Sequence, residues 1–377
     1  MIAIKGGTIM TMSGGTIQDG IILIEGNIIK EVGREVEIPP SAQVSDASGC
    51  FITPGFIDAH CHVGLVEEVN PVEGDDVNET SDPITPFLHA LDGVNLRDCA
   101  FADAVQSGIT RLLVHPGSTN IIGGQSVLLK SWAPSLSEMV YRPQWGMKAA
   151  LGENPKRIYG KKDKMPKTRM ASAALLRKAL FMAQKNRDKK QLSPNDHFEL
   201  EGLFKVIRGE MPLWIHVHRA DDILTALRIK DEFQIEMVLQ HGTEAHLVAD
   251  DIAKRGVAVC LGPLLINRAK VEMREVSFRN AALLHQAGVK FCLITDHPEV
   301  PIQYLGMCGA LAAREGLEEN AALQALTLNA AEILGVEKEL GSIEPGKRAD
   351  IVIFEGHPLD LKSKVRHVLV DGLMWGE

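Results

Sequence analysis

Two histidines separated by one residue give the strongest chemical signal in this 377-residue chain. His60 and His62 end the segment Pro-Gly-Phe-Ile-Asp-Ala-His-Cys-His at residues 54–62. Residues two apart on a β-strand point to the same face, so the two imidazoles would lie side by side. Neutral imidazoles placed in this way favour a divalent metal ion. The pair alone would fit equally well as two unrelated polar residues at a strand end.

Further metal-type ligands end later apolar runs of strand length. His216 and His218 occur in Leu-Trp-Ile-His-Val-His, His241 closes Met-Val-Leu-Gln-His, and Asp296 closes Phe-Cys-Leu-Ile-Thr-Asp. A single histidine in such a place is more often a core residue than a ligand. Four strand ends that each offer a ligand are hard to reach by chance, so the set predicts one metal centre at the ends of several strands.

The middle of the chain alternates between strand-like and helix-like stretches. The expected strands are residues 110–114, 146–151, 213–217, 235–239, 257–261 and 290–294. The expected helices are residues 98–107, 171–185, 197–208, 220–229, 245–255, 278–287 and 318–326. Buried strands that alternate with helices indicate a parallel sheet. Because no Gly-x-Gly-x-x-Gly follows the first strand, we expect an α/β fold with a closed (β/α)8 barrel rather than a Rossmann sheet.

Both ends of the chain are rich in short strands. Glycine turns separate apolar runs within residues 1–53, and residues 349–354 and 365–370 have the same character. We therefore expect a small β-sandwich-like domain from residues 1–54 plus 342–377, with the barrel spanning 55–341. Residues 63–90 and 152–170 are expected as loops at the mouth of the barrel, where barrel enzymes place their active sites.

Composition limits the kind of partner. There are 40 basic and 49 acidic residues, a formal charge of −9, which argues against a general binder of nucleic acid or anionic membranes. The six cysteines form no Cys-x-x-Cys pair, which is typical of free thiols in a reducing compartment. With neither a signal peptide nor a transmembrane run recognised, we expect a cytoplasmic protein that acts on a small molecule, and we expect a homo-oligomer.

The motif at residues 54–62, the later strand-end histidines and the final aspartate resemble the amidohydrolase superfamily. The C-terminal run Gly-Ser-Ile-Glu-Pro-Gly-Lys-Arg-Ala-Asp-Ile-Val at 341–352 is similar to that family's return to its small β domain. The resemblance covers nearly the whole chain, and it looks closest to the imidazolonepropionase-like metal-dependent amidohydrolases. It implies that His60 and His62 are first-strand ligands and that His216 and His241 are later ones. It also implies that Asp296 both contacts metal and moves protons.

The resemblance also implies a bridging carboxylate in members with two metals, from a glutamate or a carboxylated lysine near the fourth strand. Glu153, which follows the run 146–151, is the favoured bridge, and Lys130 is the rival if it is carboxylated. If neither bridges, one metal is held by the first-strand histidines, His216 and Asp296, and His241 turns to the substrate. We expect zinc, one or two ions per chain, although iron or manganese would suit the same ligands.

Substrate contacts are expected just past the strand ends. His218 would be an inward neighbour of the ligand His216, although the reverse assignment of this pair stays open. Arg219 and Asn154 would hold a substrate carboxylate, with solvated loop charge as the competing reading. Gln125, beside a Gly-Gly turn, and His297, next to Asp296, would also face the substrate.

These residues suit hydrolysis of a C–N bond in a cyclic amide, an amide or a dipeptide-like molecule. Metal lowers the pKa of bound water towards ~7, which supplies hydroxide at neutral pH. Asp296 would take the water proton and pass it to the leaving nitrogen. One alternative is a deaminase acting on a heterocycle, but deaminases of this superfamily place a glutamate two or three residues after the fifth-strand histidine, where this chain has His218 and Arg219. An inactive scaffold relative would be expected to have lost ligands.

Overall fold

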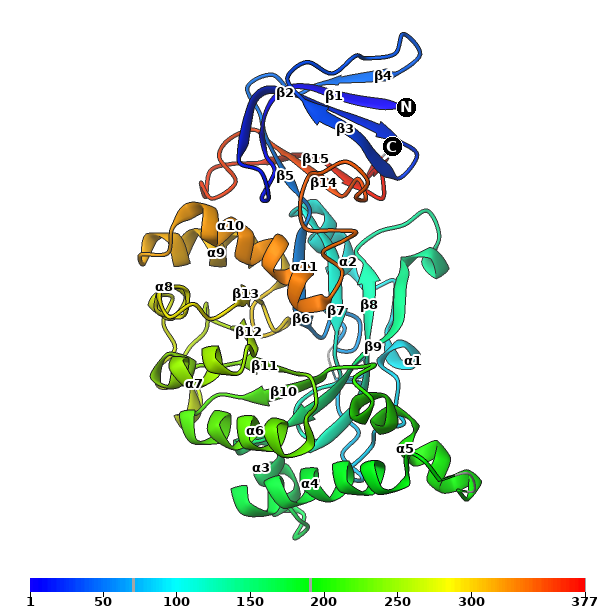
Figure 1. Ribbon diagram of the computed structural model, residues 1–377, viewed down its shortest axis with the longest axis vertical. Coiled ribbons are helices and arrows are strands. Elements are labelled where there is room, and N and C mark those ends of the chain that lie inside the picture. Colours follow the sequence, from blue (N-terminus) through cyan, green and yellow to red (C-terminus); the bar gives the residue numbers. More distant parts are fainter. Residues whose placement is uncertain (70–71, 190–191, 377) are drawn as a thin grey trace.

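The computed structural model describes residues 1–69, 72–189 and 192–376, which form two sheets and a layer of helices (Figure 1). The first sheet takes strands from both ends of the chain, as expected, and lies next to both termini. Its order is β16-β15-β14-β5-β1-β2-β3, and β4 pairs with β1. Its strands are β1 (Ile2–Met10), β2 (Thr16–Glu25), β3 (Ile28–Gly33), β4 (Gln43–Asp46), β5 (Phe51–Pro54), β14 (Ile351–Phe354), β15 (Val365–Val370) and β16 (Leu373–Met374). The domain boundaries at 54 and 342 stay a prediction.

The second sheet is a nearly closed barrel of eight strands in sequence order. Its strands are β6 (Phe56–Cys61), β7 (Ile109–Val114), β8 (Ile122–Lys130), β9 (Val140–Ala150), β10 (Leu213–Val217), β11 (Met237–His241), β12 (Ala258–Leu261) and β13 (Phe291–Leu293). Backbone hydrogen bonds join its two edge strands just past their ends, from Asp296 N to His60 O at 3.2 Å and from His62 N to His297 O at 2.9 Å. The ends of β6 and β13 are therefore neighbours in space.

The expectation of a regular (β/α)8 repeat is only partly correct. Strand β8 was not expected, and it runs antiparallel to both β7 and β9. Only residues 115–121 separate β7 from β8, whereas a parallel crossover needs about a dozen residues or more. The short connection therefore forces an antiparallel pair, and Gly123-Gly124 lies inside this strand rather than in a tight turn.

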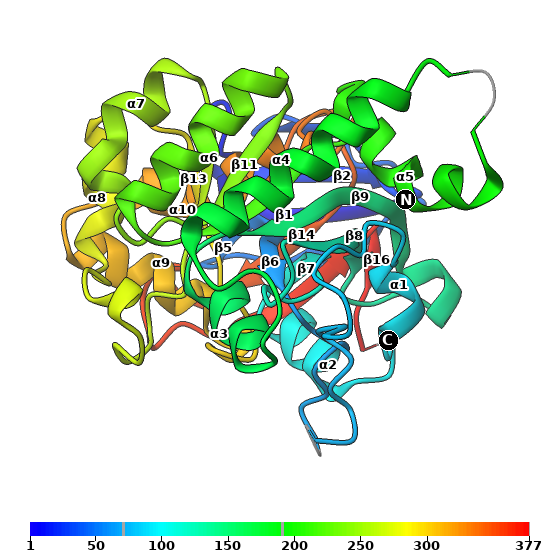
Figure 2. The same cartoon turned by 90° about the horizontal axis from the view of Figure 1, so that it is seen from below.

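Helices cover the outside of the barrel, and Figure 2 shows α4 and α6 to α9 around its strands. They are α1 (Ala90–Gly93), α2 (Cys99–Gln106), α3 (Glu153–Lys161), α4 (Arg169–Asn186), α5 (Pro194–Ile207), α6 (Ala220–Phe233), α7 (Ala249–Lys254), α8 (Arg279–Gln286), α9 (Leu305–Arg314), α10 (Glu319–Leu326) and α11 (Leu328–Leu334). Helix α3 occupies a stretch expected to be a loop, and Gly152 caps it with a φ of 81° that favours glycine. Within the described ranges, no helix has both the length and the apolar character needed to cross a membrane.

A buried arginine connects the two sheets. Arg111 on β7 is fully buried, and its guanidinium contacts Asp350 at 3.0 Å and Asp371 at 2.7 Å. Lys130 also contacts Asp371, at 2.8 Å. Because both carboxylates belong to the C-terminal strands or their turn, these ion pairs fix the first sheet to the base of the barrel.

Replacing this arginine is expected to destabilise the fold strongly. Arg111→Met would leave Asp350 with a buried, uncompensated charge, and breaking such a pair typically costs about 3–5 kcal/mol. Arg208→Ala is the control, because its ion pair with Glu210 is exposed and should contribute at most about 1 kcal/mol. Urea unfolding followed by circular dichroism measures both. Equal losses of stability in the two variants would contradict this role.

Candidate metal centre

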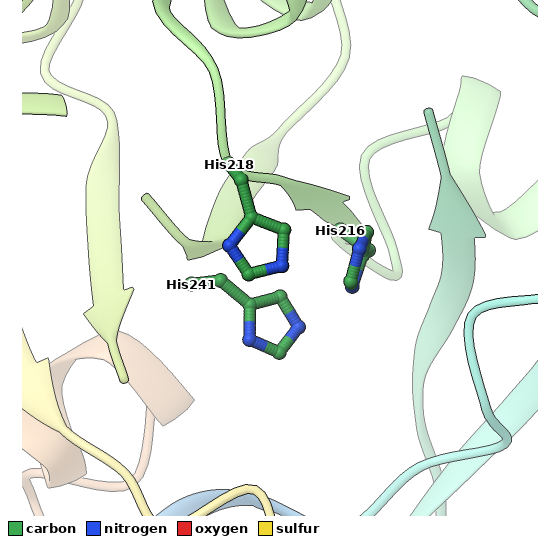
Figure 3. Close-up of side chains that lie close together, drawn as sticks. All are labelled: His216, His218 and His241. Carbon is green, nitrogen blue, oxygen red and sulfur yellow. The ribbon is translucent and has the colours of Figure 1, made fainter. Parts of the chain in front are cut away.

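Two groups of potential metal ligands meet at the carboxyl ends of the barrel strands. Within each group, one ligand atom from every residue lies within 4.8 Å of the others. The two groups are His60, His62 and Asp296, and His216, His218 and His241. The first comes from the end of β6 and the segment after β13, and the second from the ends of β10 and β11 (Figure 3). The barrel thus brings together residues that are up to 236 positions apart in the sequence.

The first group places imidazole nitrogens against a carboxylate. Nε2 of His60 lies 2.8 Å from Asp296 Oδ1, and Nε2 of His62 lies 3.4 Å from the same oxygen. His62 donates from Nδ1 to the carbonyl oxygen of His115 at 2.7 Å. A neutral His62 ring therefore presents the lone pair of Nε2 to the carboxylate. Two acceptors that face one another in this way favour a cation between them.

The second group also leaves nitrogen lone pairs free. Nδ1 of His241 donates to the carbonyl of Gly262 at 2.8 Å, and Nδ1 of His218 is hydrogen-bonded to Thr243 Oγ1 at 2.8 Å. The ring of His216 lies to one side of the stacked His218 and His241 rings, with its centroid 4.3 Å from that of His241 and 4.7 Å from that of His218 (Figure 3). On His218 and His241, Nε2 is thus the nitrogen that remains free to bind a metal ion.

The two groups adjoin one another. The ring centroids of His60 and His241 are 4.8 Å apart, and His241 Nδ1 lies 3.8 Å from Asp296 Oδ2. His241 and Asp296 both have left-handed backbones, with φ of 72° and 56°. Non-glycine residues adopt this conformation rarely, and it often marks a functional site.

Burial favours the neutral form of four of these histidines. It lowers the pKa of His60, His216 and His241 well below the ordinary value, and it lowers that of His218 to about 4. Burial acts to raise the pKa of Asp296, but the contacts with His241 and His62 outweigh it, and the pKa lies below its usual value. Neutral imidazoles and an ionised carboxylate are the protonation states that bind metal.

Several buried nitrogens in this centre have no protein partner among the described residues. They are Nδ1 of His60, both ring nitrogens of His216 and Nε2 of His241. Leaving a buried polar atom unsatisfied costs roughly 1–3 kcal/mol. A divalent cation could take one lone pair from a neutral imidazole ring, and a set of imidazoles plus one carboxylate suits zinc, iron or manganese. The residues therefore fit a metal centre.

A lysine that the sequence reasoning missed lies inside the barrel. Lys148 on β9 is fully buried, and its Nζ donates to Oε1 of Gln240, whose Nε2 lies 3.0 Å from His115 Nε2. Burial lowers the pKa of Lys148 to about 7. Gln240 thus links the Lys148 amine to His115, whose ring stacks on that of His60 with centroids 4.8 Å apart. A lysine within an otherwise apolar run was the signal that could have revealed it.

The two expected bridging residues lie elsewhere. Lys130 is wrong as a bridge: β8 is antiparallel, so its last residue pairs with Arg111 at the far end of the barrel and contacts Asp371. Glu153 begins α3 and is half-buried. Within the part of the chain that the structure describes, it belongs to neither ligand group.

The residues that were expected to contact the substrate lie in different surroundings. His218 joins the second ligand group, and Asn154 is buried with its Nδ2 on Ser118 Oγ at 2.9 Å. Arg219 is engaged in two hydrogen bonds to Asp221, at 2.9 and 3.0 Å.

Gln125 lies outside the barrel. A Cβ on Gly202 of α5 would lie 2.9 Å from Nε2 of Gln125, so the side chain of Gln125 faces the helices. The next residue, Ser126, hydrogen-bonds to His115 inside the barrel. Side chains alternate between faces along a strand, which explains the error. His297 is buried beside the centre, where its Nδ1 accepts from Ile302 N at 3.2 Å.

Two further carboxylates belong to the surroundings of the centre and were not expected. Asp58 is fully buried, and burial raises its pKa to about 7. It accepts from His60 N at 3.0 Å and from Thr295 Oγ1 at 2.5 Å, so it fixes the end of β6 to the segment that carries Asp296. Glu272 lies 3.9 Å from the nearest nitrogens of the second histidine group.

Comparisons with known proteins place the chain in a family. The sequence pattern of the Amidohydrolase family matches residues 173–374. The crystal structure of an amidohydrolase from Thermotoga maritima MSB8 is 38% identical, with a TM-score of 0.95 over 100% of this chain and 99% of that one.

More distant relatives extend the comparison. Amidohydrolase tasK of Hapsidospora irregularis is 29% identical over 94% of this chain. This chain spans only 39% of the length of that relative. A prolidase in complex with N-methylphosphonate-L-proline is 19% identical, with a TM-score of 0.66 over 99% of this chain and 98% of that one, and it shares the fold.

Proposed function

Because this chain belongs to the amidohydrolase family, we propose that it is a metal-dependent hydrolase that cleaves a C–N bond of a small molecule. The bond belongs to a cyclic amide, an amide or a dipeptide-like substrate. The observation that carries this proposal is the meeting of two groups of ligands, five histidines and one carboxylate, at the carboxyl ends of the barrel strands. The imidazolonepropionase-like subgroup, the cytoplasmic location and the homo-oligomer stay predictions from the sequence.

Two divalent cations would be held by these residues, with zinc as the first candidate. His60, His62 and Asp296 would hold one, and His216 and His241, with His218 beside them, would hold the other. A bound cation of this kind polarises a carbonyl and lowers the pKa of water. The protein supplies fixed positions for the ligands, since His60, His216 and His241 are buried at the ends of their strands.

Asp296 is the proposed proton carrier. Its low pKa keeps it ionised at neutral pH, so it is ready to accept the proton of the attacking water and deliver it to the leaving nitrogen. Its backbone N–H donates to His60 O at 3.2 Å, and its carbonyl accepts from Glu299 N at 2.9 Å. These bonds hold the carboxylate at the centre.

Lys148 is proposed as the bridge between the cations, in place of Glu153. With a pKa of about 7, a large fraction of its amine is neutral at neutral pH. A neutral amine attacks carbon dioxide, forming an N–C bond and releasing one proton, and the resulting carbamate is an anionic oxygen donor. The position of Lys148, hydrogen-bonded to Gln240 beside His115 and His60, suits that role.

Deamination of a heterocycle is less well supported. A deaminase would need a free acid shortly after His216, and the two acids in this segment are engaged. Asp221 accepts from Arg219, and Asp222 accepts from Arg169 at 2.9 Å.

A substrate panel tests the proposed function. The metal-loaded protein is incubated with cyclic amides, N-acyl amino acids, dipeptides and amino-heterocycles, and the released amine or ammonia is measured. We expect hydrolysis of members of at least one of the first three classes, and its loss after chelation of the metal. Ammonia released from amino-heterocycles alone would favour the deaminase, and no hydrolysis of any class would contradict the proposal.

A further inference from the structure

A buried glutamate beside the metal centre has a free carboxylate oxygen. Glu272 lies in the 3-10 helix η3 (Val271–Met273), after β12, and is 1% exposed. Its Oε2 accepts from the backbone N–H of Glu153, the first residue of α3, at 3.1 Å. Among the described residues, its Oε1 has no hydrogen-bond partner. One oxygen is therefore fixed by the main chain while the other stays available.

The free oxygen faces the second histidine group. Oε1 lies 3.9 Å from Nε2 of His216 and 3.9 Å from Nε2 of His218. This is too long for a hydrogen bond. Among the described residues, Glu272 belongs to neither group of potential metal ligands. The spacing leaves room for a separate hydrogen-bond donor between Glu272 and the histidines.

Neighbouring carboxylates already have cationic partners, but Glu272 does not. Asp222 pairs with Arg169 at 2.9 Å, and Glu244 pairs with Arg274 at 3.2 Å. In the described part of the chain, no lysine or arginine lies within 4.0 Å of the Glu272 carboxylate. A buried, unpaired carboxylate is costly, so a positive group from outside the protein would stabilise it.

The backbone around Glu272 is shaped to leave this space. Residue 152 has no side chain, and a Cβ on Gly152 would lie only 3.0 Å from Oε2 of Glu272. A larger residue there would push the carboxylate away from the backbone N–H that orients it. Glycine at this helix start therefore preserves the position of Glu272 as well as the turn.

On this basis, and resting on the proposed function, we propose that Glu272 binds a protonated amino group of the substrate, next to the bond that is cleaved. The substrate class is then an amide or dipeptide with a free amino group rather than an N-acylated one. Glu272 would accept one N–H of the ammonium through Oε1, and the scissile carbonyl would face the metal ligands. The residue thus sets specificity, whereas the histidines and Asp296 carry the chemistry.

Matched substrate pairs test this assignment. Alanyl-proline and alanine anilide are compared with their N-acetyl counterparts, using the metal-loaded wild type, Glu272→Gln, Glu272→Asp and the control Glu275→Gln. Glu275 lies on the same segment and its side chain is about half exposed. We expect the wild type and Glu275→Gln to prefer the free amine by at least about 100-fold in kcat/KM, on the scale by which losing a buried polar partner discriminates substrates. Glu272→Gln should lose at least tenfold of this preference, mainly through KM, and Glu272→Asp should retain part of it.

Metal content separates the possible outcomes. We expect the same metal content per chain in the wild type and in Glu272→Gln. Loss of metal from Glu272→Gln would overturn the inference, because Glu272 would then be a ligand. Equal hydrolysis of both members of each pair by the wild type would also overturn it, while leaving the proposed hydrolase function intact. Hydrolysis of neither member, with no shift in Tm on addition of either, would overturn the inference, and the wider panel would then decide the proposed function.

Discussion

Asp296→Asn is expected to lower kcat by a factor on the order of 10²–10⁴, the range that a positioned acid–base group contributes. Asparagine keeps the size of the side chain and one oxygen near His60 and His62, but it cannot take up the proton of the attacking water. Its neutral amide also places an N–H₂ group where the ionised carboxylate meets the histidines. Steady-state kinetics on a hydrolysed amide measures the effect.

The loss should appear in kcat with an intact fold. Circular dichroism and Tm check the fold, and metal analysis separates a lost proton carrier from a lost ligand. Asp231→Asn is a suitable control, because Asp231 forms an exposed ion pair with Arg255 far from the centre. An Asp296→Asn enzyme within threefold of the wild type would show that proton transfer depends on another residue.

A second large effect is expected for Lys148→Met, which should lower both the metal content and the hydrolytic activity. Methionine fills the buried space on β9 but forms no carbamate. Weakening a residue that merely supports a metal ligand costs about 10–100-fold in affinity or activity, and loss of a bridge should cost at least as much. Metal analysis of protein refolded or reloaded with zinc, with and without bicarbonate, measures the effect.

Bicarbonate gives this prediction a specific signature. The wild type should bind more metal when bicarbonate is present, whereas Lys148→Met should not respond to it. Glu153→Ala is the matched comparison, because the half-buried Glu153 side chain belongs to neither ligand group among the described residues. If Glu153→Ala loses the metal and Lys148→Met retains it, Glu153 is the bridge after all.

The grouping of the candidate ligands could be predicted because their positions follow a simple rule. His60, His216 and His241 end apolar runs, and the carboxyl ends of parallel strands meet at one end of a barrel. The relation between His60 and Asp296, 236 residues apart, depends only on both lying at the ends of neighbouring edge strands. The membership of the first sheet was equally readable, because both ends of the chain carry short strands and glycine turns.

The remaining features depend on contacts that have no local pattern. Strand β8 contains Gly123-Gly124, which has the local character of a turn, and only pairing with β7 and β9 makes it a strand. Because β8 runs antiparallel to its neighbours, its last residue, Lys130, lies at the end of the barrel opposite to the candidate ligands. Lys148 sits in the middle of a strand, where burial by the rest of the barrel gives it its chemistry. Glu272 lies in the three-residue 3-10 helix η3, which is too short for a periodic pattern to point to it.

The most direct test of the central claim is the metal content of the purified wild type, measured together with its amide hydrolysis before chelation, after chelation and after metal is restored. The account predicts about two divalent ions per chain, activity that disappears as they are removed, and activity that returns in proportion as they are replaced. Undiminished amide hydrolysis by protein from which all metal has been removed would contradict it.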